Sequence, residues 1–137
     1  MANAVDRNLG AFNNLALLLG RVLIGALFVI AAYNALRNLP GMTTYFTRLG
    51  IPMATIATPA VAIFELVLGV LVIVGYQTRL VALGLAVFVV FAAVIAHMNF
   101  ADPNQVNHFL KCLGIIGGCL ALMVSGPGTF SVDARRR

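Results

Sequence analysis

Long apolar runs separated by short polar breaks divide this chain into four segments. The runs cover residues 15–36, a stretch that begins between residues 51 and 60 and ends at 75, residues 80–96, and residues 109–124. With its flanking residues, each run reaches about 20 residues, enough for a helix to cross a hydrocarbon core of roughly 30 Å. The strict alternation typical of membrane β-barrel strands does not appear. The pattern therefore predicts an all-α fold, an integral membrane four-helix bundle.

The connections between these runs are short. Tyr76-Gln77-Thr78 alone separates the second run from the third, which predicts a tight antiparallel helical hairpin. Four spans with short links predict an up-down-up-down bundle with both chain ends on one side of the membrane. We expect spans at about 15–38, 52–75, 79–97 and 108–125 in one membrane domain (15–126), between an N-terminal segment (1–14) and a C-terminal tail (127–137).

Prolines mark the expected helix ends. Pro40-Gly41 predicts a turn after the first span. Pro52 and Pro59 each suit a first helical turn, and if Pro52 begins the second span, Pro59 should kink it.

Composition agrees with a membrane protein. Hydrophobic residues make up 61% of the chain and charged residues only 9%, which excludes an ordinary soluble domain. The net charge of +5 does not indicate a nucleic-acid partner, because lysines and arginines before the last three residues occur singly near the ends of apolar runs and form no basic face with aromatics. The expected partner is the lipid bilayer. The first run is too long for a signal-peptide core, so we expect it to be a retained span.

The basic residues predict an orientation. Those on the side of the chain ends are Arg7, Arg79, Arg135, Arg136 and Arg137, and those on the other side are Arg37, Arg48 and Lys111. Because cytoplasmic segments carry the excess of positive charge, both termini are predicted to be cytoplasmic. Three of the five arginines on the terminal side are the last residues of the chain, and the excess of positive charge on that side depends mostly on them.

Glu65 lies in the middle of the second run. An ionisable group in a membrane span is costly, so its presence indicates a functional site and a partner for its charge. Helix rise places Glu65 near mid-membrane and Arg21 somewhat closer to the terminal side. We therefore predict an Arg21–Glu65 pair inside the bundle. Such a pair either fixes helix register alone or forms a polar site for a quinone headgroup, a proton or a small solute.

A second polar group is expected on the non-terminal side, where three spans begin or end. Its members are Tyr33, Asn34, Arg37, His97, Asn99, His108 and Lys111. They form either an interfacial collar or the mouth of a ligand pocket.

No cofactor motif is evident. Haem ligation by the two histidines is disfavoured, since neither has a second histidine four residues away and Cys-x-x-Cys-His is absent, and no metal site is predicted. Cys112 and Cys119 share a helix face about 10.5 Å apart, too far for a disulfide, and small apolar packing is expected of them. Gly114 and Gly118 predict a close helix approach, within the bundle or between copies.

Many of these residues, taken in order, resemble the DoxX family of small four-span membrane proteins. The matching pieces are Arg21, Leu49-Gly50-Ile51-Pro52, Glu65 with Gly69, Gly75-Tyr76-Gln77-Thr78-Arg79, Asn99-Phe100, Asp102-Pro103, His108-Phe109-Leu110-Lys111, Gly117-Gly118, and the run from Gly126 to Asp133. The chain departs from the family at residues 32–36, where a Gly and a Lys are common, and at Cys112, where an Asn is common.

The resemblance implies a protein of a bacterial-type inner membrane. It implies an accessory or anchoring subunit of a membrane redox complex, possessing a quinone or small-ligand pocket, rather than a self-sufficient enzyme. Its partners would be other membrane or redox subunits, and a homo-oligomer stays open. The alternatives are a permeation protein for protons or small solutes, with Glu65 as the central residue, and a structural or assembly factor without chemistry.

Overall fold

The chain is all-helical throughout the part that the structure describes. The computed structural model describes residues 4–137, with the backbone alone for residues 4–7, so the side chain of Arg7 lies outside the described residues. The helices are α1 (Ala4–Arg37), α2 (Leu39–Arg48), α3 (Ala54–Val74), α4 (Thr78–Ala96), α5 (Pro103–Ser125) and α6 (Val132–Arg135). By length and hydropathy, α1 from Asn8 onward, α3, α4 and α5 can each span a membrane. The predicted all-α fold with four spans is confirmed.

Local sequence determines where the spanning helices begin and end. The Asp102 side chain accepts a hydrogen bond from the amide of Asn104, and Pro103 occupies the first turn of α5. α5 therefore begins before the expected residue 108. α3 ends at Gly75, whose φ of 74° lies in the left-handed region that glycine adopts without strain. Pro59 lies inside α3, which starts at Ala54 and not at Pro52.

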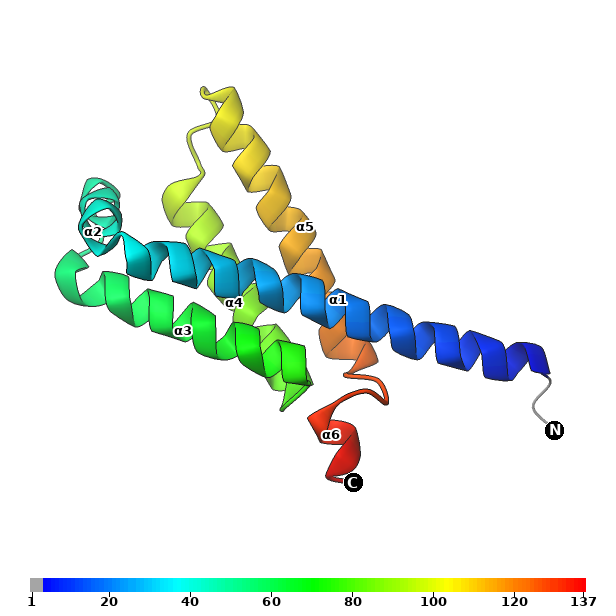
Figure 1. Cartoon of the computed structure of the whole chain (residues 1–137). Helices are drawn as coiled ribbons and strands as arrows, with labels where there is room; N and C mark the ends of the chain where they lie inside the picture. The colour runs from blue at the N-terminus through cyan, green and yellow to red at the C-terminus, as the bar shows by residue number, and fades with distance from the viewer. Residues whose placement is uncertain (1–3) are drawn as a thin grey trace.

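α2 is an additional short helix between the first two spans. The turn predicted at Pro40-Gly41 is wrong, because both residues lie in the first turn of α2. The Asn38 side chain caps this helix by accepting from the amide of Gly41, and a proline is tolerated in a first turn. None of the residues of α2 is fully buried, and the helix lies beside the end of the α1–α3 pair (Figure 1).

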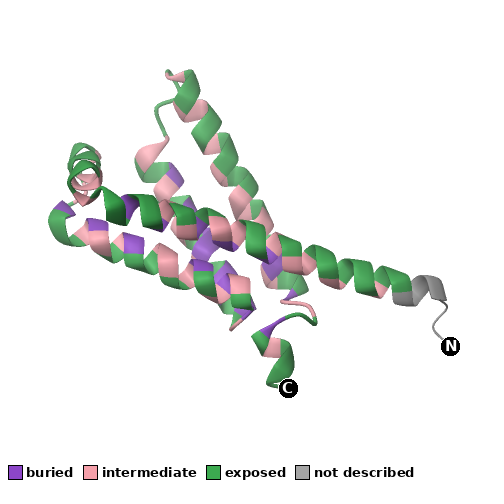
Figure 2. Cartoon of the chain, viewed as in Figure 1, coloured by how far each residue is buried: buried purple, intermediate pink, exposed green. Residues whose placement is uncertain are grey.

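The spanning helices associate mainly as two pairs. α1 packs along α3 and α4 packs along α5, and the two pairs meet near the C-terminal end and spread apart toward the other end (Figure 1). The buried core lies where the pairs meet, as Figure 2 shows. Its members include Phe28, Val72, Leu85, Cys119 and Leu122. Packing between the pairs is thus concentrated at one end of the bundle.

A glycine contact joins α1 to α3. A Cβ at Gly25 would overlap Cγ1 of Ile73 and lie 2.6 Å from the carbonyl oxygen of Gly69. Gly114, in contrast, has no atom within 4 Å of a Cβ position, and the nearest atom at Gly118 is a side-chain carbon of Ile24 at 3.5 Å. The close approach within the bundle therefore occurs at Gly25 and Gly69, and none is formed at Gly114 and Gly118 among residues 8–137. A close approach there between copies of the chain stays a prediction.

Candidate functional site

Arg21 is fully buried and is bound to the chain segment that follows α5. Its Nη1 donates to the carbonyl oxygen of Pro127 at 2.8 Å, and its Nη2 donates to the carbonyl oxygen of Phe130. The guanidinium also lies beside Gly75, at the end of α3. Arg21 thus lies level with the ends of α3 and α5, near one boundary of the spanning region.

The predicted Arg21–Glu65 pair is not formed. The prediction took the first span to begin near residue 15, where the apolar run begins, but α1 already begins at Ala4. α1 therefore extends beyond the other spanning helices on this side (Figure 1). The guanidinium of Arg21 lies beside Gly75, at the end of α3, and Glu65 lies about 15 Å from Gly75 along that helix.

The segment from Pro127 to Ala134, which we call the C-terminal clasp, ties several helices together. The amide of Thr129 donates to Oδ1 of Asn14 at 3.0 Å, which joins the clasp to α1. The amide of Asp133 donates to the carbonyl oxygen of Gly75 at 3.0 Å, which joins it to the end of α3. The clasp begins directly after α5, so with Arg21 these bonds connect α1, α3 and α5 at one end.

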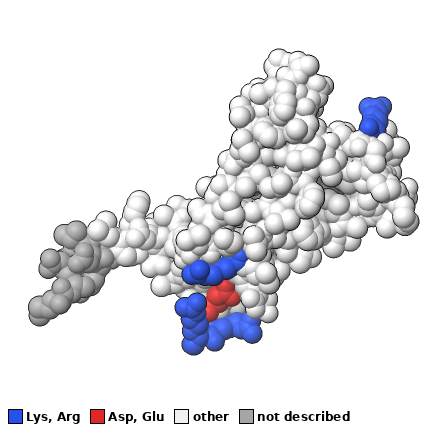
Figure 3. Space-filling model, turned by 180° about the vertical axis from the view of Figure 1, so that it is seen from behind, with Lys and Arg blue, Asp and Glu red and all other residues white. Residues whose placement is uncertain are grey.

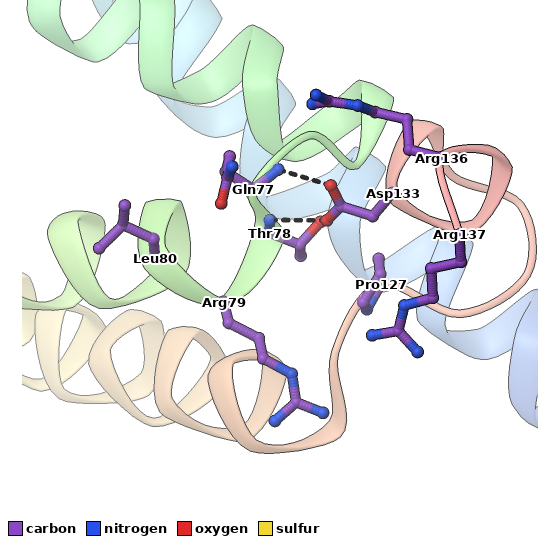
Figure 4. A pocket seen from close by; sticks show the side chains of 8 residues that line it. All are labelled: Gln77, Thr78, Arg79, Leu80, Pro127, Asp133, Arg136 and Arg137. Carbon is purple, nitrogen blue, oxygen red and sulfur yellow. Dashed lines mark hydrogen bonds between the residues drawn. The ribbon is translucent and has the colours of Figure 1, made fainter.

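Asp133 joins the start of α4 to the C-terminal clasp. Its carboxylate accepts hydrogen bonds from the amides of Gln77 at 2.8 Å and Thr78 at 2.9 Å, as Figure 4 shows. These amides stand at the start of α4, where backbone donors have no helical acceptor. Partial burial alone would raise the pKa of Asp133, but these two hydrogen bonds and the charge of Arg136 outweigh it and lower the pKa below its ordinary value.

The Asp133→Asn variant is expected to be less stable than the parent protein by about 1 kcal/mol at neutral pH, because an amide side chain has one acceptor oxygen and so keeps only one of the two hydrogen bonds to Gln77 and Thr78. Because the folded-state pKa is depressed, the contribution of Asp133 is present above the unfolded-state pKa of about 4 and is lost as the pH falls through the folded-state value. Thermal unfolding in detergent between pH 7 and pH 3 measures both effects. A variant with the same melting temperature as the parent at pH 7 would contradict this role.

Glu65 lines a separate cavity of about 360 Å³. It lies on the inward stripe of α3, which includes Thr58, Ala62, Gly69 and Val72 at helical spacing. The cavity walls come from α1, α2, α3 and α4 and are mostly apolar. The lining residues with polar groups are Tyr45, Thr58, Glu65 and His97.

The carboxyl group of Glu65 lines this cavity, and no basic side chain among residues 8–137 pairs with it. The Thr58 hydroxyl nearby donates to the carbonyl oxygen of Ala54 at 2.8 Å. Glu65 therefore supplies the strongest hydrogen-bonding group that the cavity offers to a ligand.

Of the predicted pocket-mouth residues, only His97 lines the cavity. Its Nδ1 lies 2.7 Å from Oε1 of Gln105, and its ring stacks on that of His108 with centroids 5.2 Å apart. These contacts hold the end of α4 against the start of α5. His97 thereby links the cavity wall to the α4–α5 pair.

The other members of that predicted group lie elsewhere. Arg37 lies over the ring of Tyr33 on the exposed side of α1, 5.4 Å from its centroid, and Asn34 and Asn99 are exposed. Lys111 lines a groove between α1 and α5 instead. The structure therefore does not bring these residues together at one pocket mouth.

Sequence reasoning missed two groups of residues at these sites. Met42, Tyr45 and Phe46 of α2 line the Glu65 cavity, and the signal for them was the cap residue Asn38 ahead of Pro40. Asp133 of the clasp and Asn14 of α1, which binds the clasp, were also missed, because hydrogen bonds to distant backbone groups leave no local pattern.

Neither cysteine forms a disulfide; Cys119 is buried in the core and Cys112 is half-buried. Among the described residues, no group of three or more His, Cys, Asp or Glu side chains is arranged to hold a metal ion.

Comparison with known proteins gives consistent matches along the chain. The family model described as DoxX matches residues 16–98. Inner membrane protein YqjF of Escherichia coli (strain K12) is 32% identical over 120 residues, covering 88% of this chain and 91% of that protein. Inner membrane protein YphA of the same strain is 30% identical over 132 residues, covering 92% and 94%. No solved structure matches this chain.

Proposed function

This chain belongs to the DoxX family, and we propose that it binds a small, mostly apolar molecule with a hydrogen-bonding headgroup, such as a quinone, in the cavity beside Glu65. The observation that carries this proposal is the lining of the cavity, in which one carboxyl group lies among apolar walls inside a membrane-spanning region. An intramembrane carboxyl group without a basic partner is costly and is retained where it has a role.

Size and chemistry support a ligand of this class. The cavity of about 360 Å³ falls in the range of small-molecule sites, which are mostly apolar with a few polar groups that orient the ligand. A quinone headgroup has an apolar ring and two carbonyl oxygens, so a protonated Glu65 would donate to one of them. The aromatic rings of Phe88 and Phe91 offer flat apolar walls for the ring.

We further propose that the chain acts as an accessory or anchoring subunit of a membrane redox complex. The family resemblance supports this role, because a subunit that binds a quinone would hold it within reach of a partner that carries the redox centre. The matching proteins from Escherichia coli are inner membrane proteins, and we propose the same location here.

Substitution of Glu65 tests whether the cavity binds the proposed ligand. Glu65→Leu is expected to weaken the binding of a short-chain ubiquinone at least tenfold, since loss of one hydrogen bond to the headgroup is worth about 1.4 kcal/mol. The affinity is measured by calorimetry on protein in lipid nanodiscs. Asp102→Asn is the matched control, because Asp102 is a carboxylate outside the cavity and Asn caps a helix as well as Asp does.

Equal affinity in the parent protein and in Glu65→Leu would contradict the proposed site. A second variant, Ala92→Phe, keeps Glu65 but places a large side chain in the cavity wall, and it should also weaken binding at least about tenfold. Proton or solute flux through liposomes containing the protein, stopped by Glu65→Leu, would favour a permeation path instead.

We propose that both termini are cytoplasmic. The structure places the start of α4 and the C-terminal arginines at the same end of the molecule, so Arg79 and Arg135–Arg137 count together under the positive-inside rule. A green fluorescent protein fused to the C-terminus should fluoresce, and alkaline phosphatase fused after Arg48 should be active. The reverse result would mean the opposite orientation.

A further inference from the structure

A basic cluster surrounds the C-terminal clasp. Seen from behind in Figure 3, basic atoms enclose a small acidic patch at this end of the molecule, while most of the rest of that face carries no charge. A hollow of about 440 Å³ lies here, lined by Arg79, Arg136 and Arg137 together with Asp133. A second hollow of about 290 Å³ shares Arg79, Asp133 and Arg137 with it.

Two of the three arginines point to the same side of the clasp. In Figure 4 the guanidinium groups of Arg79 and Arg137 extend to one side near Pro127, while Arg136 turns away. Arg136 lies over the ring of Tyr76, 5.1 Å from its centroid. The arrangement leaves a space between Arg79 and Arg137 into which donors from both side chains reach.

Asp133 does not neutralise these two arginines. Its two carboxylate oxygens accept from the amides of Gln77 and Thr78, and its single negative charge is outnumbered by the three arginines that line the hollow. Arg79 and Arg137 therefore present positive charge toward the hollow, and guanidinium groups bind phosphate through paired hydrogen bonds.

An apolar groove continues from the basic hollow along the membrane-facing side of α3 and α4. Leu80 lines the hollow and is 67% exposed. The same Leu80 lines a groove of about 440 Å³ formed by Leu83, Gly84, Val87 and aromatic residues of α3 and α4. A basic site thus adjoins a hydrocarbon-facing groove at the boundary of the spanning region.

We propose that an anionic phospholipid binds here, with its phosphate between Arg79 and Arg137 and one acyl chain in the groove that starts at Leu80. Each half of the site matches one half of such a lipid, and the order of the two halves matches the direction from membrane surface to membrane interior. A free phosphate ion would use the arginines but not the groove. This site is separate from the Glu65 cavity and does not depend on its role.

Lipid binding to the purified full chain in detergent tests this assignment. Native mass spectrometry with phosphatidylglycerol should show bound lipid, and phosphatidylcholine should bind at least about tenfold more weakly because it lacks net charge. Arg79→Gln with Arg137→Gln should lower phosphatidylglycerol affinity about tenfold or more. The matched control is Arg37→Gln with Arg48→Gln, which removes the same charge at the other end and should leave the affinity unchanged.

Further variants distinguish lipid binding from the binding of a free phosphate ion and from a folding defect. Gly84→Leu fills the groove, where a Cβ meets only Leu68 at 3.6 Å, and should weaken phosphatidylglycerol binding with both arginines intact. If it has no effect while inorganic phosphate displaces the lipid, the site binds phosphate alone and the lipid proposal is wrong. Arg137→Gln alone changes only an exposed terminal side chain, so unchanged binding in that variant and in the double variant would also overturn the proposal.

Discussion

Arg21→Ala is expected to lower the free energy of unfolding by about 3 kcal/mol. The substitution removes both donors to the carbonyl oxygens of Pro127 and Phe130, and hydrogen bonds to a charged group contribute about 1.5–3 kcal/mol each. Thermal unfolding in detergent measures the loss. Since the same two bonds hold the C-terminal clasp against α1, the variant should also be cleaved faster by a protease in the segment after α5.

Two further substitutions make the Arg21 result specific. Arg48→Ala removes an exposed arginine at the other end and should change stability by less than about 0.5 kcal/mol. Arg21→Lys keeps the charge but loses the planar fork that reaches two acceptors, so it should fall between the parent and Arg21→Ala. Unchanged melting temperature and unchanged proteolysis in Arg21→Ala would show that the clasp is held by other contacts.

Gly25→Ala is expected to destabilise the protein by about 2 kcal/mol, the usual cost of adding an atom to a closely packed contact. The new Cβ would overlap Cγ1 of Ile73 and lie 2.6 Å from the carbonyl oxygen of Gly69, and the latter atom is backbone that cannot rotate away. α1 and α3 must therefore separate. Unfolding in detergent, together with a cysteine cross-link between the two helices, would detect the change.

Gly114→Ala is the matched control for this prediction. It is the same chemical change in a spanning helix, at an exposed position with no atom within 4 Å of the added carbon. It should leave the melting temperature unchanged or raise it slightly, because alanine is the better helix former. Equal losses in the two variants would mean that the α1–α3 contact is not close.

Much of the fold is predictable from the sequence because the bilayer leaves few alternatives for an apolar chain. Each apolar run must satisfy its backbone groups internally, so the four runs predict four helices. α2 was missed because this short segment lacks the long apolar run by which a spanning helix is recognised. The cap at Asn38 and the proline in its first turn were the signals available for it.

The candidate sites were less predictable. Glu65 falls at helical spacing with Thr58, Ala62 and Gly69, so its inward position can be predicted from the sequence. The depth of Arg21 in the bundle cannot be predicted in this way, since it depends on where α1 begins and not on where its apolar run begins. Its partners are backbone carbonyls 106 and 109 residues away, and backbone acceptors carry no residue-specific signal.

The two ends of the molecule have different physical characters. At one end the clasp, Arg21 and Asp133 hold the helix pairs together by hydrogen bonds to backbone groups. Toward the other end the pairs spread apart (Figure 1), and α2 with α3 and α4 encloses the Glu65 cavity. Stability and ligand binding are thus expected to respond to different substitutions.

Photolabelling with an azido-quinone tests the central claim most directly. The protein in nanodiscs is irradiated with the probe, and mass spectrometry locates the modified residues. We predict labels on the cavity walls contributed by α2, α3 and α4, near Phe46, Glu65 and Ala92, and their loss in Ala92→Phe. Labels confined to the lipid-facing surface or to the α1–α5 groove, unaffected by Ala92→Phe, would contradict a binding site beside Glu65.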